Sequence, residues 1–214
     1  MIITPAQRLW IPTDGNCNDV VQGLTLTDTN VIYADGVIGK AAIFGASGAK
    51  SEVSDIIDNS SQGTICMRVT PLLLTVNYCL ASFTRDTTAA YLAFYIISGK
   101  LCIQSFTTGG NVHLGTTSIP TSATHIAFVS TGTAYLLYVN GVLDPRLNAT
   151  YDNGDWLSDN PSRDRFTLGA YRSPAGVYSS FMNGGIEDVQ LYNIALPISD
   201  IKRIRDGLHP LTKG

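Results

Sequence analysis

Hydrophobic and polar residues alternate along most of this chain with the period of two that is typical of β-strands. Residues 64–71 are a clear example, because Ile65, Met67 and Val69 fall on one face and the residues between them on the other. Such a segment predicts a strand that buries one side against a core.

Turn signals separate these strands at short intervals. Residues 90–97 and 101–106 flank Ser-Gly-Lys, and residues 124–129 and 134–139 flank Ser-Thr-Gly-Thr. The dipeptide Asn140-Gly141 that follows is the strongest local signal, because both residues tolerate the positive φ of a type I′ turn. Turns every ~8–12 residues are typical of a sandwich or barrel. The sequence therefore predicts an all-β, antiparallel fold.

A convincing helical period occurs near the C-terminus. Ile201, Ile204 and Leu208 are spaced to form one apolar stripe that can pack on a sheet. Ser199 is the predicted N-cap and Gly207 the predicted end of the helix. We therefore expect one short C-terminal helix.

Composition limits the possible functions. Of the 214 residues, 44% are hydrophobic and only 14% are charged, against a usual ~25% charged, which excludes a disordered chain. The net charge of −3 and the lack of a basic block give no support for nucleic-acid binding. The longest apolar stretches fall short of the ~18 residues of a membrane helix, so we expect no membrane insertion. No repeat or linker divides the chain, which predicts a single domain over residues 1–214.

The four cysteines show no CxxC pairing, and the three histidines lack ligand spacing to any of them, which argues against zinc. Reduced, buried thiols are the favoured interpretation, and disulfides are the alternative. The cysteines are Cys17, Cys66, Cys79 and Cys102.

Four blocks of sequence, in order, resemble the laminin-G-like branch of the concanavalin A-like lectin/glucanase superfamily. The blocks are residues 9–19, 36–45, 125–142, and 166–169 continued by 181–201, of which the run Phe-Met-Asn-Gly-Gly-Ile-Glu-Asp-Val-Gln-Leu-Tyr-Asn is the most specific. The resemblance implies a two-sheet jelly-roll sandwich in which the first and last strands lie side by side. The hairpins and Asn-Gly turn independently favour an antiparallel sandwich.

Glycan hydrolysis is the first activity to consider, because the superfamily includes retaining glucanases. Such enzymes need two carboxyl groups roughly 5 Å apart, which on one strand means acids two or four positions apart. The chain has only two glutamates, Glu52 and Glu187, and neither lies in a Glu-x-Asp-x-x-Glu run. No Gly-x-Ser-x-Gly elbow occurs either. We therefore expect a protein that is not an enzyme.

Calcium is a more plausible ligand, because the run from Asp14 to Asp19 offers several side-chain oxygens close together. In the family that the chain resembles, calcium often bridges the N-terminal region and the final strands. The resemblance thus implies a structural calcium site whose ligands are Asp14, Asn16, Asp19, Glu187 and Asp188.

Strict alternation places Glu187 on the same face as Val189 and Leu191, so its carboxylate should have a partner. The alternative to calcium is an Asx-turn within residues 14–18 and ordinary hydrogen bonds for Glu187.

The irregular stretch 147–165 gathers acids, asparagines and aromatic residues. A long polar loop in a β-domain is uncommon unless it has a function, and aromatic rings with Asp and Asn partners suit carbohydrate binding. The predicted glycan-binding residues are Tyr151, Asp152, Asp155, Trp156, Tyr171 and Tyr178. The alternative is that Trp156 and Tyr171 anchor the core or a loop.

These observations predict a non-enzymatic binding or assembly module. The sequence starts at Met1 without a basic and apolar leader, and a free-standing jelly roll with few charges fits a bacteriophage virion component, in a capsid decoration or a fibre. Its partners would be other virion proteins, further copies of itself or host cell-surface glycans. The alternative is a carbohydrate-binding or adhesion module of an exported protein, and a glycan-active enzyme is a third hypothesis.

Overall fold

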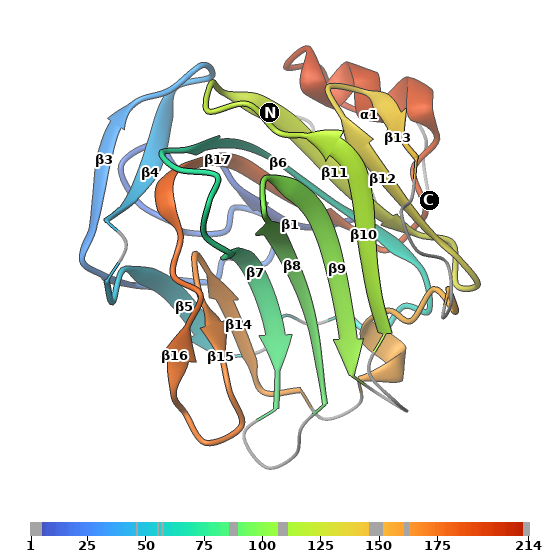
Figure 1. The fold of residues 1–214 in the computed structure, drawn as a ribbon, viewed down its shortest axis with the longest axis horizontal. Coiled ribbons are helices and arrows are strands. Elements are labelled where there is room, and N and C mark those ends of the chain that lie inside the picture. Colours follow the sequence, from blue (N-terminus) through green and yellow to red (C-terminus); the bar gives the residue numbers. More distant parts are fainter. Residues whose placement is uncertain are drawn as a thin grey trace.

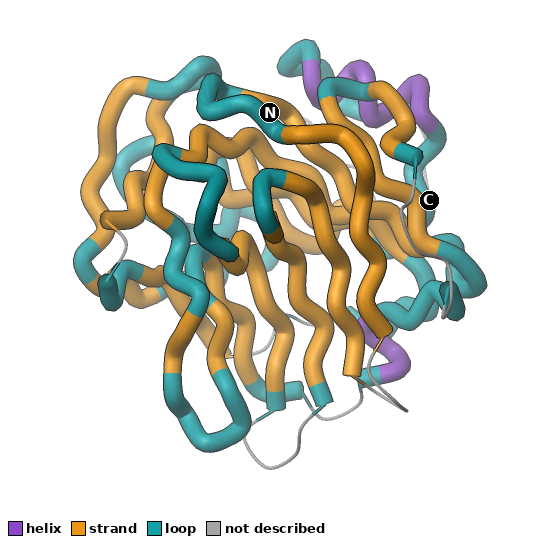
Figure 2. Tube along the Cα trace, in the orientation of Figure 1, coloured by secondary structure: helices purple, strands orange, loops and turns teal. Residues whose placement is uncertain are grey.

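Two antiparallel sheets pack face to face in the computed structural model of this chain (Figure 1). The structure describes residues 6–45, 47–54, 56, 58–85, 90–106, 111–145, 152–160 and 163–211. Strands dominate the described trace, and helix appears in two short segments (Figure 2). The predicted all-β sandwich with a short C-terminal helix is confirmed.

The first sheet has eight strands. In spatial order they are β13 (Val142–Asp144), β12 (Tyr135–Val139), β11 (Thr124–Ser130), β6 (Gly63–Pro71), β17 (Asn183–Tyr192), β4 (Lys40–Gly45) and β3 (Val31–Asp35), with β1 (Gln7–Ile11) paired to β17. Because β1 pairs antiparallel with β17, the first and last strands lie side by side, as the resemblance implied.

The second sheet has seven strands. In spatial order they are β10 (Asn111–Ser118), β9 (Lys100–Phe106), β8 (Tyr91–Ile97), β7 (Tyr78–Thr84), β14 (Arg165–Leu168), β5 (Lys50–Ser54) and β2 (Thr27–Thr29). A small hairpin of β15 (Tyr171–Arg172) and β16 (Tyr178–Ser179) follows β14 and contacts β7. A 3₁₀ turn, η1 (Leu157–Asp159), and α1 (Ile198–Arg205) complete the described elements.

The core lies between the two sheets, where the alternating apolar side chains of both meet. Met67 of β6 and Phe128 of β11 point inward from the first sheet, and Phe94 of β8 points inward from the second. The rings of Phe94 and Phe128 lie 5.1 Å apart between centroids and join the two layers. Burying each such ring stabilises the fold by about 1.5–3 kcal/mol.

The alternation of inward and outward side chains shifts by one residue in the middle of strand β17. Ile186, Val189 and Leu191 all reach the core, so the inward positions are first three and then two residues apart. Asp188, with a φ of 53°, is the extra residue of a β-bulge. Glu187 therefore points to the outer surface of the first sheet, and the predicted placement beside Val189 and Leu191 is wrong.

Two of the predicted hairpin turns form with the expected backbone. Ser98 and Gly99 connect β8 to β9, and Asn140 and Gly141 connect β12 to β13. All four residues have positive φ, between 49° and 73°, the conformation that makes a two-residue turn match the twist of its strands.

Helix α1 covers part of the outer surface of the first sheet (Figure 1). Ile201 and Ile204 are buried there against β6, β11 and β12, as predicted. The helix begins after Pro197 instead of Ser199 and ends at Arg205, so Leu208 lies beyond it and is half exposed. The prediction placed Leu208 on the helix, because the spacing of apolar residues does not show where a helix ends.

All four cysteines are buried and unpaired, in line with the favoured interpretation of buried thiols. The helices of the described residues are too short to cross a membrane.

Candidate functional site

Aromatic rings gather on the outer surface of the second sheet. Tyr91 of β8 pairs with Phe106 of β9, and their rings are nearly parallel with centroids 5.9 Å apart. Tyr171, from the hairpin, lies 5.2 Å from the Tyr91 ring and 6.4 Å from the Tyr95 ring. We call the surface formed by Tyr91, Phe106 and Tyr171 the aromatic face, and the buried Tyr95 packs against it.

Alternation along β8 explains why these rings point outward. Leu92 and Phe94 enter the core, so Tyr91, Ala93 and Tyr95 point to the opposite side of the sheet. Ala93 and Tyr95 are buried there, and Tyr91 is partly exposed. Phe106 keeps 41% of its surface exposed, which is high for a large apolar residue in a strand. Tyr91 and Tyr171 beside it are partly exposed.

Polar side chains border the aromatic face. Gln104 of β9 pairs with Ala93 and is half buried, so its amide can donate and accept hydrogen bonds beside the rings. Arg165 of β14 pairs with Thr84 of β7, which pairs in turn with Tyr91. The surface thus combines flat apolar rings with hydrogen-bonding groups.

The β15–β16 hairpin is held on the sheet by a charged network. The Tyr178 hydroxyl donates to Glu52 of β5 at 2.5 Å and accepts from Nε of Arg172 at 3.1 Å. Lys50 forms an ion pair with Glu52, and its Nζ lies 4.3 Å from the centre of the Tyr178 ring. Burial raises the pKa of Glu52, but the hydrogen bonds from Lys50 and Tyr178 outweigh it and the pKa is lowered. The network therefore fixes the strand that carries Tyr171.

The predicted glycan-binding residues divide between two places. Tyr171 borders the aromatic face and Tyr178 anchors its hairpin. Trp156 is fully buried, 5.8 Å from the ring of Phe94, so it belongs to the core and its predicted ligand contact is wrong. Tyr151 lies outside the described residues.

The two predicted loop acids hold the loop against the sandwich. Asp152 Oδ1 accepts the backbone N–H of Tyr135 at 2.6 Å. Asp155 accepts the Ser105 hydroxyl through its side chain at 3.2 Å and the Tyr135 hydroxyl through its carbonyl at 2.6 Å. These contacts give both acids a structural role that a polar loop sequence does not reveal.

Tyr91 and Phe106 were missed as candidate site residues. The signal was present, because Tyr91, Ala93 and Tyr95 alternate with the strongly apolar Leu92 and Phe94. Period-two alternation with aromatic residues on both faces indicates one core face and one exposed aromatic face.

The predicted calcium ligands near the N-terminus accept hydrogen bonds from the backbone. Asp19 accepts the N–H groups of Trp10, Val21 and Gln22 at 2.6–3.0 Å. Asn16 accepts the N–H of Asn18 at 2.9 Å, which is the Asx-turn expected as the alternative. These side-chain oxygens accept backbone N–H groups. A cation could bind them only by displacing those hydrogen bonds.

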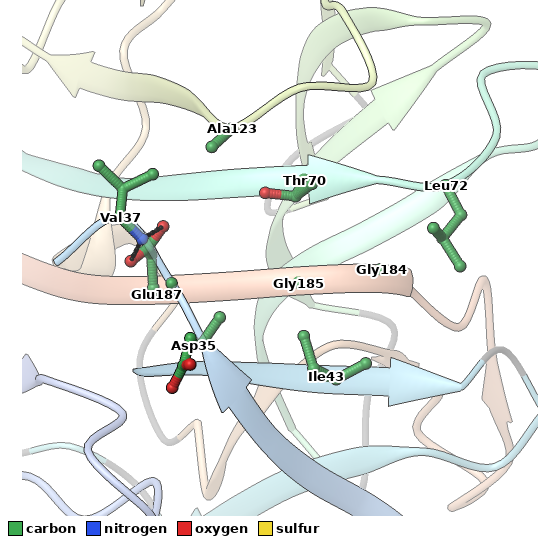
Figure 3. A pocket seen from close by; sticks show the side chains of 11 residues that line it. Asp35, Val37, Ile43, Thr70, Leu72, Ala123, Gly184, Gly185 and Glu187 are labelled. Atoms are coloured by element: carbon green, nitrogen blue, oxygen red, sulfur yellow. Dashed lines mark hydrogen bonds between the residues drawn. The ribbon is translucent and has the colours of Figure 1, made fainter. Parts of the chain in front are cut away.

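The predicted calcium ligands of the last strand also accept hydrogen bonds. Glu187 accepts the N–H group of Val37 at 2.9 Å (Figure 3) and that of Ile38 at 2.9 Å. Asp14 accepts the N–H of Lys40 at 3.1 Å, so these two acids hold the β3–β4 turn from either side. Asp188 accepts the indole N–H of Trp10 at 2.8 Å.

Within the part of the chain that the structure describes, no three histidine, cysteine, aspartate or glutamate side chains are arranged to hold a metal ion. The two glutamates of the chain lie on different sheets, Glu52 on β5 and Glu187 on β17. They therefore cannot act as the carboxyl pair of a glycosidase.

A shallow groove opens beside Glu187 on the outer surface of the first sheet (Figure 3). Its volume is about 370 Å³. Gly185, Ile43 and Thr70 are among its lining residues, and Leu72 and Val37 stand at its sides. None of the described residues that line it is aromatic, so these residues offer no ring on which a sugar could stack.

The comparisons with known proteins agree with this architecture. The family model of the Laminin_G_3 type, described as the concanavalin A-like lectin/glucanases superfamily, matches residues 44–202. The chain belongs to this superfamily. The resemblance read from the four sequence blocks is thereby confirmed. No curated protein sequence matches the chain.

Solved structures of the same fold include two sugar complexes. Domain 4 of the extracellular arabinanase AbnA from Geobacillus stearothermophilus, in complex with arabinotriose, is 21% identical with a TM-score of 0.71, over 94% of this chain and 98% of that one. The CBM40 module of the Ruminococcus gnavus sialidase, bound to α2,3-sialyllactose, is 19% identical with a TM-score of 0.59, over 68% and 83%. At these identities the likeness establishes the concanavalin A-like fold.

A botulinum neurotoxin type C structure, whose cell entry depends on two ganglioside molecules, is 13% identical with a TM-score of 0.69. The match covers 95% of this chain and 51% of the toxin chain.

Proposed function

We propose that this protein is a non-catalytic carbohydrate-binding module that holds a saccharide against the aromatic face. The observation that carries the proposal is the outward-pointing group of Tyr91, Phe106 and Tyr171 on the second sheet. Its rings lie on adjacent strands and on a hairpin held by the Glu52 network.

Flat aromatic rings suit the C–H faces of sugars, which are apolar, while hydroxyl groups around the sugar ring need hydrogen-bond partners. Gln104 supplies an amide beside the rings, and the hydroxyl groups of the tyrosines supply further donors and acceptors. Most of these groups lie on strands, which hold them more rigidly than loops would. A rigid surface loses little entropy on binding.

The similar structures support this proposal, because arabinotriose and sialyllactose are each bound by a protein of the same fold. They favour the carbohydrate-binding alternative over the virion component. Location in a virion and self-association stay predictions.

The test is isothermal titration calorimetry with a panel of neutral and acidic oligosaccharides. We expect binding in the micromolar to millimolar range and at least a tenfold loss of affinity for Tyr91→Ala and for Phe106→Ala, since aromatic contacts dominate the energy of such surfaces. Melting temperatures report whether the variants fold.

Ile32→Ala provides the matched control, because Ile32 is 67% exposed on β3 of the first sheet. Its affinity for the saccharide should equal that of the wild type. If the wild type binds a saccharide and neither aromatic substitution weakens it, the aromatic face is not the site.

A further inference from the structure

We propose that α1 is a pH-sensitive cover of the first sheet, which is released more often in acid because the buried imidazole of His125 then gains a proton. The inference is independent of the proposed saccharide site, which lies on the other sheet. It is carried by the position of His125, by the charged groups around it and by the contacts that hold the end of α1 on the sheet.

His125 lies on β11, close to the C-terminal end of α1. Ile126 and Phe128 enter the core, so the side chain of His125 points to the outer surface that α1 covers. Its backbone N–H donates to Oδ1 of Asn140 at 3.1 Å, and its carbonyl accepts the N–H of Asn140 at 2.7 Å. Arg205, the last residue of α1, donates from Nη1 to the carbonyl of Asn140 at 3.0 Å. The end of the helix and the histidine therefore meet at the same turn.

The imidazole of His125 is buried without a hydrogen-bond partner. Its residue is 1% exposed, and neither Nδ1 nor Nε2 meets a donor or an acceptor of the residues that the structure describes. A proton added here would place a charge and an unpaired N–H in a site that is closed to water, which is strongly unfavourable. Release of α1 would let water reach the ring and would remove this penalty.

The charged groups around His125 are mostly cations. Arg68 of β6, its cross-strand neighbour, and Arg205 of α1 both disfavour its protonation, while Asp206 favours it. The carboxylate of Asp206 accepts from Nε and Nη2 of Arg205 at 2.8 and 3.0 Å, so its charge is balanced by that arginine. Lys202 adds a positive charge one turn earlier on the helix. A proton on His125 would thus be repelled by the helix that covers it.

Other titratable groups also lie near α1. Burial raises the pKa of Cys66 on β6 and of Tyr138 on β12, so both are neutral below pH 7. Glu187 of β17 is a cross-strand neighbour of Arg68 and accepts two N–H groups of the β3–β4 turn. Asp200, buried in the first turn of α1, accepts a backbone N–H at 2.9 Å. Protonation of these acids would act on α1 by another route, which histidine variants distinguish.

The contacts that hold the end of α1 involve the same arginines. Nη2 of Arg68 donates to the carbonyl oxygen of Arg205, which engages this carbonyl at the end of the helix. The remaining attachment is apolar and comes from Ile201 and Ile204, which pack on the sheet. A positive charge on His125 would therefore act on the groups that fasten the helix, and the apolar contacts alone would have to resist it.

The pKa of His125 sets the expected size of the effect. With α1 in place the pKa is lowered to about 3, and with α1 released it would return to its ordinary value of 6.5. Below pH 6.5 the released form binds a proton that the covered form does not, so acid favours release. Between pH 7 and pH 5 the population of the released form should rise about twentyfold.

Cys66 reports on the release, because its thiol is buried under α1 together with Ile201 and Ile204. The experiment labels the full chain with a low concentration of 4,4′-dithiodipyridine at pH 7 and pH 5, so that each rate follows the population of the open form. Mass spectrometry assigns the label to a cysteine, and each rate is divided by that of the urea-unfolded chain at the same pH. We expect Cys66 to react faster than the other three buried cysteines, with a normalised rate about twentyfold higher at pH 5 than at pH 7.

Histidine variants separate the imidazole from the acids near α1. His125→Asn and His125→Leu offer a polar and an apolar side chain that does not titrate, and either variant should lose most of the rise in the Cys66 rate. His209→Asn is the matched control, because His209 follows α1 and packs on the ring of Trp10. It should keep the wild-type rise, and urea denaturation shows whether each variant is folded.

Equal normalised rates for all four cysteines would show that only global unfolding exposes Cys66, and would overturn the inference. A Cys66 rate that is the same at pH 7 and pH 5, or that rises fully in both His125 variants, would overturn it as well. None of these outcomes bears on saccharide binding, which is measured on the other sheet.

Discussion

His125 shows how strongly folding changes the chemistry of a single residue. It is 1% exposed, and no described residue forms a hydrogen bond to either of its ring nitrogens. Burial, together with the positive charges of Arg68 and Arg205, lowers its pKa from 6.5 to about 3. The imidazole is therefore neutral in the folded protein at neutral pH.

The shift predicts a pH-dependent stability. Between pH 6.5 and about 3 the unfolded chain binds a proton at His125 that the folded chain does not, so the free energy of unfolding decreases as pH falls through this window. Urea denaturation at pH 7 and pH 5 measures this loss, and His125→Asn should make it smaller. His209→Asn, at a half-exposed position beside Trp10, should keep the wild-type loss, and equal losses in all three proteins would contradict the prediction.

At the scale of the element, strand β17 lies so close to β6 at Gly184 that a side chain there would meet the β6 backbone. Gly184 has a φ of 142°, and a Cβ added there would lie 2.2 Å from the carbonyl oxygen of Thr70. Gly184→Ala should lower the free energy of unfolding by about 3 kcal/mol, because strain and a backbone clash add together.

The neighbouring Gly185 is the matched control. A Cβ added there would meet only side chains, the nearest being Cδ1 of Ile43 at 3.3 Å. Gly185→Ala should therefore cost less than about 1 kcal/mol. Denaturant titration of both variants measures the difference in their free energies of unfolding. Similar losses of stability in the two variants would show that β17 does not approach the Thr70 carbonyl so closely.

At the scale of the whole molecule, the first and last strands are joined by a backbone ladder. β1 pairs with β17 over residues that include Leu9 and Leu191, and the Trp10 indole donates to Asp188 across the same junction. Each predicted carboxylate ligand of calcium accepts an N–H group, and calcium binding stays a prediction.

Chelation tests the calcium prediction directly. From the hydrogen bonds of Asp14, Asp19 and Glu187 we expect the melting temperature to be the same in EDTA and in millimolar calcium. A bound ion at a hundredfold excess over its dissociation constant would add ~2.7 kcal/mol. A fall of several degrees in EDTA would therefore establish calcium binding, and Asp19→Ala would show whether that carboxylate is a ligand.

Short-range patterns determined much of this protein. The alternation of Ile65, Met67 and Val69 set the inward face of β6, and the Asn140-Gly141 dipeptide set a hairpin. The apolar spacing of Ile201 and Ile204 set the buried side of α1. Each of these depends on residues a few positions apart, whose geometry the backbone fixes locally.

Tertiary structure decided the rest. The bulge at Asp188 reversed the face of Glu187, because one inserted residue changes the alternation and only the ladder with β6 shows it. Trp156 is part of the core, and the ring of Tyr91 meets that of Tyr171, which comes from a hairpin far away in the sequence. The alternation of apolar and polar residues along a strand assigns each side chain to one of two faces. Which face is covered, and which distant side chain or N–H group lies opposite, depends on strand order, and that is fixed only when the two sheets pack.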